Sequence, residues 1–156
     1  STSKNAKEMP VLIEKIKEKI NTDAAQGNEY FVMIGGDFNT DSRSTTTNFM
    51  KDVFVTSAPY PVDQNGNSNT SAARSAPLDY LMCSPDWCQY EVPVEIGVHT
   101  DSNAYKNGHV FDTRVYYKYK VGSGTELDYV PPAESGDSGA TQMQHMPVIR
   151  DFEYSY

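Results

Sequence analysis

The first third of the chain carries a helical and then an extended pattern of apolar residues. Over residues 5–20 the apolar side chains recur at three- and four-residue steps, which predicts an amphipathic helix with Met9, Leu12, Ile13, Ile16 and Ile20 on one face. A continuous run from Glu29 to Ile34 stops at Gly35-Gly36, the pattern of a short strand covered on both faces. This order of helix, loop and buried strand is typical of an α/β fold.

Proline, glycine and small polar residues set the limits of the predicted elements up to residue 76. Pro10 fits the first helix only in its first turn, because proline has no amide hydrogen to donate. Thr45 to Lys51 predict a second, short helix that is capped by a preceding serine and leads into a strand-like stretch at Val53–Val55. Residues 59–76 carry Pro, Asn, Gly and Ser without periodicity, which predicts a long surface loop.

The rest of the chain predicts strands separated by loops. Short apolar or alternating runs occur at Leu78–Cys83, Tyr90–Ile96 and Val110–Val121, and Val148-Ile149 with Phe152–Tyr154 form a closing strand. Residues 122–141 are rich in Gly, Ser and Pro and read as irregular. The fold class predicted from these patterns is α/β, or α+β in schemes that separate the two.

The charge balance excludes one class of function. The 156 residues contain 13 Lys and Arg against 21 Asp and Glu, a net charge of −8 at pH 7. A domain that binds nucleic acid on its own presents a basic surface to the phosphates, so this chain does not fit that class.

No apolar run approaches the ~18 residues that a membrane span requires, so no membrane span is expected. A chain of this length is expected to build one core.

The cellular compartment stays open. The N-terminus shows no basic region followed by an apolar stretch, so a signal peptide is either absent or already removed, and a secreted or periplasmic location is slightly favoured. Cys83 and Cys88 lack the second Cys or His pair of a zinc site. They form either a local disulfide or two buried thiols.

Four polar residues stand where predicted strands begin or end. Asp37 and Asn39 follow Gly35-Gly36, and an extended segment would place both side chains on one face. Asp79 lies inside an apolar run, where a buried carboxylate requires a partner, and His145 precedes the last strand. Each also has a plain structural interpretation, as a turn former, an exposed edge residue or a surface histidine.

Three motifs follow one another in the order Gly36-Asp37-Phe38-Asn39, Leu78-Asp79-Tyr80 and Gln144-His145-Met146-Pro147-Val148. Together they resemble the C-terminal half of the endonuclease/exonuclease/phosphatase superfamily, which contains the DNase I-like nucleases and inositol-phosphate phosphatases. The resemblance covers nearly the whole chain. Arg74 and Asp112-Thr113-Arg114 also resemble a bacterial branch of this superfamily, in which Met-Gln-His-Met replaces the commoner Ser-Asp-His.

The resemblance implies a fold and a division of catalytic labour. Residues 1–156 would be the C-terminal portion of a single domain, one half of a four-layer α/β/β/α sandwich. Asp37 would orient or deprotonate the attacking water, and Asn39 would hydrogen-bond the nucleophile or a phosphate oxygen. His145 would stabilise charge that develops on the phosphoryl group, with Asp79 fixing its tautomer.

Substrate and metal contacts follow from the same resemblance. Asn39, Arg74 and His145 would contact the substrate. Gln144 stands where the family has an Asp that helps to hold the metal, and its uncharged amide would be a weaker ligand. The expected ion is Mg²⁺ or Mn²⁺, with a further ligand from an N-terminal half that this chain lacks. That half, or another chain, would also be needed to cover one sheet face.

The sequence therefore predicts part of a metal-dependent phosphoesterase, a phosphodiesterase or nuclease, with nucleic acid among the candidate phosphate-ester substrates. The chain alone is expected to be inactive. A non-catalytic binding or interaction module on the same scaffold is the alternative, which Gln144 and the missing half favour. Gly136-Asp137-Ser138-Gly139 is similar to the nucleophile segment of chymotrypsin-like proteases, but the chain is too short for two barrels.

Overall fold

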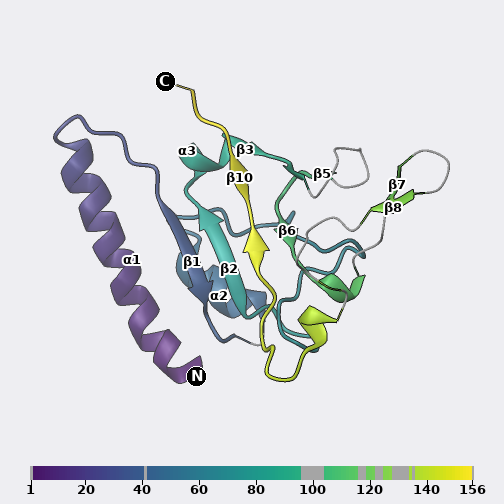
Figure 1. The fold of residues 1–156 in the computed structure, drawn as a ribbon. Helices are drawn as coiled ribbons and strands as arrows, with labels where there is room; N and C mark the ends of the chain where they lie inside the picture. The colour runs from purple at the N-terminus through teal and green to yellow at the C-terminus, as the bar shows by residue number, and fades with distance from the viewer. Residues whose placement is uncertain are drawn as a thin grey trace.

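The computed structural model describes residues 2–40, 42–95, 104–115, 119–121, 125–127, 134 and 136–155. Apart from the 23-residue helix α1, its helices and strands are short, and every strand pair among these residues is antiparallel, so the fold class is α+β (Figure 1). The elements are α1 (Thr2–Ala24), β1 (Met33–Asp37), α2 (Arg43–Met50), β2 (Asp79–Cys83), α3 (Pro85–Cys88), β3 (Glu91–Val92), β4 (Val94–Glu95), β5 (Ala104–Tyr105), β6 (His109–Val110), η1 (Thr113–Val115), β7 (Tyr119–Val121), β8 (Thr125–Leu127), η2 (Asp137–Gly139), β9 (Val148–Ile149) and β10 (Asp151–Phe152). Among the described helices, none is long and apolar enough to cross a bilayer.

The antiparallel pair β1–β2 is the centre of the fold. Tyr80 and Met82 of β2 turn to one face, where they are almost fully buried. Residues from α1, from the segment after β1, from α2 and from the turn after α2 complete the core on that face: Ile13, Phe38, Met50, Val53 and Phe54. The two helices therefore cover one face of the pair, and β9 and β10 run beside β2 (Figure 1).

The first predicted helix is confirmed and extends beyond residues 5–20 at both ends. Ile13 is buried as expected, but Leu12 is 41% exposed and does not belong to the buried face. Pro10 lies inside α1, so its expected restriction to the first turn is wrong. The helix tolerates it because Ala6, whose carbonyl loses its usual donor, is exposed and can bond to water.

The first strand lies further along the chain than the apolar run predicted. β1 begins at Met33 and includes both Gly35 and Gly36, which were expected to end it. Gly35 fits within the strand because the Leu81 side chain crosses it: a Cβ at Gly35 would lie 3.0 Å from Leu81 Cδ1. Most of β1 is exposed, so the expectation of a strand covered on both faces is also wrong.

A turn replaces one predicted strand and a 3-10 helix interrupts another. Val53 and Phe54 belong to a turn after α2 and enter the core, while the Val55 amide donates to the Cys83 carbonyl at 2.9 Å. The stretch predicted as one strand from Val110 to Val121 is interrupted by η1, where the Asp112 carboxylate accepts the Arg114 amide at 3.0 Å. This local bond favours a turn over a ladder. Tyr116 to Lys118 lie outside the described residues.

Cys83 and Cys88 form a disulfide, which settles the choice that the sequence left open. Their Cα atoms are 5.5 Å apart. The disulfide links the last residue of β2 to α3. Asp79 is the first residue of the same strand.

The burial of a methionine side chain determines how far its truncation lowers the free energy of unfolding. Met50 is 0% exposed in the core, whereas Met143 is 42% exposed. We expect Met50→Ala to lower the free energy of unfolding by about 2–4 kcal/mol, because it leaves a cavity. Met143→Ala is expected to change it by less than about 0.5 kcal/mol. Urea unfolding of both variants checks this, and equal losses would contradict the assignment of the core.

Candidate functional site

Asp37 and Asp79 lie directly opposite each other across the β1–β2 pair. The Phe38 amide donates to the Leu78 carbonyl at 2.8 Å, so the neighbouring pair of the ladder is the hydrogen-bonded one. Asp37 and Asp79 therefore form a non-hydrogen-bonded pair, the type in which Cα atoms come closest, about 4.5 Å, and side chains meet. The register alone brings both carboxylates to one face.

His145 reaches the same face through backbone bonds to residues 70–72. Ser71 and His145 form an antiparallel bridge, and the Ala72 amide donates to the Gln144 carbonyl at 2.8 Å. The imidazole Nδ1 then lies 2.9 Å from Asp79 Oδ2. Because an ionised carboxylate only accepts, Nδ1 carries the hydrogen and donates it, which orients the ring.

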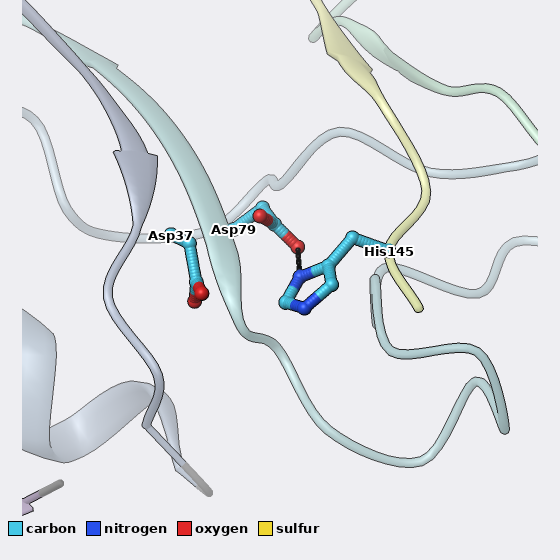
Figure 2. Close-up of side chains that lie close together, drawn as sticks. All are labelled: Asp37, Asp79 and His145. Atoms are coloured by element: carbon cyan, nitrogen blue, oxygen red, sulfur yellow. Dashed lines mark hydrogen bonds and ion pairs between the residues drawn. The ribbon is translucent and has the colours of Figure 1, made fainter. Parts of the chain in front are cut away.

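The three side chains make one compact cluster. One potential ligand atom from each of Asp37, Asp79 and His145 lies within 4.8 Å of the other two. Figure 2 shows the Asp79–His145 bond, with the Asp37 carboxylate on the neighbouring strand beside them. Asp37 is exposed, and the side chains of Asp79 and His145 are 19% and 31% exposed. Asp79 and His145 also line an open depression of about 340 Å³.

Asn39 sits beside Asp37 in a tight turn. Its φ of 51° is left-handed, so the segment is not extended there and the expected alternation of side chains does not apply. The Asn39 amide donates to Asp37 Oδ1 at 2.8 Å, and Asn39 Nδ2 lies 3.5 Å from Asp37 Oδ2. Asp37 and Asn39 are thus turn formers, and the turn holds the Asp37 carboxylate in place.

The donor set of the cluster suits a divalent cation. Carboxylate oxygens are the ligands that Mg²⁺ and Mn²⁺ prefer, and imidazole extends the range to softer metals. Ligands on opposite sides of Mg²⁺ are about 4.2 Å apart. The three atoms lie within 4.8 Å of one another, close enough to surround one shared site. The residues present therefore fit a metal site. The sequence had predicted catalytic roles for Asp37, Asp79 and His145, and a metal contact for Gln144 instead.

Arg74 lies in an ion-pair network of its own. Its Nη2 is hydrogen-bonded to the Asp63 carboxylate and its Nε lies 3.2 Å from Asp112 Oδ2. The Arg74 side chain is only 11% exposed, and both acids are buried. The guanidinium therefore joins the 59–76 loop to the segment before η1. The substrate contact expected of Arg74 stays a prediction.

Gln144 contributes to the site through its backbone. Its carbonyl accepts the Ala72 amide next to His145, and its side chain is exposed. The metal contact expected of the Gln144 amide stays a prediction.

The 59–76 loop is more than a surface connection. Asp63 and Thr70 within it are 3% and 1% exposed. Thr70 is a residue that sequence reasoning missed: its hydroxyl accepts the Asp79 amide at 2.8 Å. A threonine among the Asn, Ser and Thr residues of an aperiodic segment carries no signal that would have distinguished it.

The serine of the protease-like segment has a structural role. Ser138 in η2 is 6% exposed, and its hydroxyl accepts the Thr113 amide at 2.9 Å. The Ser138 amide in turn donates to Thr113 Oγ1 at 2.9 Å. A hydroxyl held in this reciprocal pair joins η1 to η2.

Comparison with known proteins adds no relative. No protein-family model matches the sequence, and neither the curated proteins nor the solved structures give a match. The resemblance to the endonuclease/exonuclease/phosphatase superfamily therefore rests on the three motifs and stays a prediction.

A second histidine, His109, has a structural role. It is 1% exposed, its ring lies 4.0 Å from that of Tyr105 between centroids, and its Nδ1 is 2.9 Å from the Val62 carbonyl, to which it donates. Burial lowers the pKa of His109 to about 4, against the opposing effect of the bond to Val62.

This pKa makes the stability of the fold depend on pH. The unfolded chain takes up a proton at His109 near pH 6.5, and the folded chain does so only near pH 4. Stability is therefore lost as the pH falls through this window, by about 2 kcal/mol between pH 7 and pH 5. His109→Phe is expected to be less stable at pH 7 but to lose less on acidification.

Urea unfolding at pH 7 and pH 5 measures this difference, with His145→Phe as the matched control that keeps the His109 contribution. A His109→Phe variant as sensitive to pH as the unsubstituted chain would contradict the assignment.

Proposed function

We propose that this chain is the C-terminal part of a metal-dependent phosphoesterase domain of the DNase I-like class, acting on a phosphodiester. One observation carries the proposal: Asp37, Asp79 and His145 come from three segments far apart in the sequence, and their polar atoms gather within 4.8 Å on one face. These are the residues that the three motifs single out, in the motif order.

The side chains divide the work of hydrolysis. Asp37 is exposed and held by the turn at Asn39, so its carboxylate can orient an attacking water and accept its proton. Asn39 supplies an amide that bonds the nucleophile or a phosphate oxygen. His145, with Nδ1 bound to Asp79, presents its other ring nitrogen to the phosphoryl group, where a hydrogen on that nitrogen can be donated to the developing charge.

A divalent cation completes the chemistry. Mg²⁺ or Mn²⁺ would be held by Asp37 and Asp79 beside His145, with a further ligand expected from an N-terminal half, and would supply neutralisation of the phosphate charge. Two adjacent carboxylates repel an anionic substrate, so a cation is needed before phosphate can approach them. The net charge of −8 favours a single phosphodiester group over a long duplex as the bound unit.

A binding module without catalysis is the second candidate. The exposed amide of Gln144 stands where the family has an acidic residue, which favours weak metal affinity. On this alternative the face around Asp37 would bind a phosphate group and release it unchanged.

Hydrolysis of a chromogenic phosphodiester by the longer parent protein tests the proposal. We expect Mg²⁺-dependent, EDTA-sensitive turnover that Asp37→Asn and His145→Ala each lower by about 10²–10⁴-fold, the usual contribution of an acid or base. Asp151→Asn is the matched control, because Asp151 is also an exposed strand aspartate but lies in β10. Turnover that persists in EDTA, or in both site variants, would contradict the mechanism. Metal binding without turnover would favour the binding module.

A further inference from the structure

One edge of β2 is held by groups that do not belong to a neighbouring strand. Asp79, Leu81 and Cys83 occupy the non-hydrogen-bonded positions of the β1–β2 pair, so their backbone groups point away from β1. The Leu81 carbonyl accepts Arg150 Nη1 at 3.1 Å, and the Cys83 carbonyl accepts the Val55 amide. The Asp79 amide is the donor on this edge closest to the site.

Thr70 satisfies that donor. Its Oγ1 accepts the Asp79 amide at 2.8 Å, and Thr70 is 1% exposed, so water does not replace it. The backbone of Thr70 is held as well, because its amide donates to the Ala76 carbonyl at 3.0 Å. The hydroxyl is thus a fixed acceptor in a dry environment.

The same residue holds the segment that carries His145. The Thr70 carbonyl accepts the Met146 amide at 2.7 Å, and two residues later the Ala72 amide donates to the Gln144 carbonyl. The backbone on both sides of His145 is therefore attached to residues 70–72. Among these bonds, the one that the Thr70 hydroxyl accepts from the Asp79 amide is the one that depends on the side chain.

We propose that Thr70 is a positioning residue that sets the alignment of Asp79 with His145, and thereby the affinity of the site for a divalent cation. The metal part of this inference rests on the proposed function. Thr70 links the strand that carries Asp79 to the segment that carries His145 through two adjacent hydrogen bonds. Groups that orient the residues of a metal site in this way usually change metal affinity by about 10–100-fold when they are removed.

Isothermal titration of the chain with Mn²⁺ tests the metal part. Thr70→Val keeps the shape of the side chain but removes the acceptor, and we expect about tenfold weaker binding of Mn²⁺. Thr70→Ser keeps the hydroxyl and is expected to retain the affinity. Thr46→Val is the matched control: Thr46 is also 1% exposed, and its hydroxyl is hydrogen-bonded to Thr40, but it lies in α2. A purely structural role for Thr70 would give equal affinities in the two valine variants, which would overturn the proposal.

A measurement without metal separates this inference from the proposed function. The ¹⁵N shifts of the His145 ring report which nitrogen carries the hydrogen, and we expect the Nδ1–H form to lose population in Thr70→Val but not in Thr46→Val. Unchanged ring shifts in Thr70→Val would overturn the inference even if Mn²⁺ binds. Absence of Mn²⁺ binding by the unsubstituted chain would overturn its metal part together with the metal site. The bond to Thr70 should also protect the Asp79 amide hydrogen from exchange with solvent. Rapid hydrogen exchange at this amide in the unsubstituted chain would overturn the inference.

Discussion

The register of one short strand pair determines whether this chain has a site at all. Asp37 and Asp79 meet because they are opposite residues at a non-hydrogen-bonded position of β1–β2. A slip of one residue would turn one of the carboxylates to the helix-covered face, where an unpaired charge is costly. The pairing of Ile34 with Met82 on the core side therefore fixes the geometry of the acids on the open side. The core and the site therefore lie on opposite faces of the same strand pair.

The contact between Asp79 and His145 was expected from the sequence motifs, but the turn at Asn39 and the part played by Thr70 were not. Asp37, Asp79 and His145 stand next to apolar runs, and the run around Asp79 correctly marked a strand with buried neighbours. The expected shared face of Asp37 and Asn39 failed, because the left-handed backbone at Asn39 is a local choice that no periodicity reports. Thr70 could not be recognised, since its role depends on a hydrogen bond to a residue nine positions away.

The boundaries of the elements failed for related reasons. Gly35 reads as a strand terminator, yet it lies within β1 because Leu81 packs across it from the partner strand. Val53 and Phe54 have the composition of a strand, but burial against α2 and β2 holds them in a turn. In both cases a tertiary contact overrides a local preference. The helical pattern of α1 was the most reliable signal, because 3.6-residue periodicity over several turns is difficult to produce otherwise.

The proposed chemistry requires a cation that Asp37 and Asp79 bind beside His145. Its most direct test is a crystal structure of the chain soaked in Mn²⁺, with data collected to reveal the anomalous signal of the metal. We predict one strong anomalous peak at bonding distance from Asp37 and Asp79, next to the His145 ring, with the two strands in the register described above. A peak only at other residues, or a His145 ring turned away from both acids, would contradict the central claim.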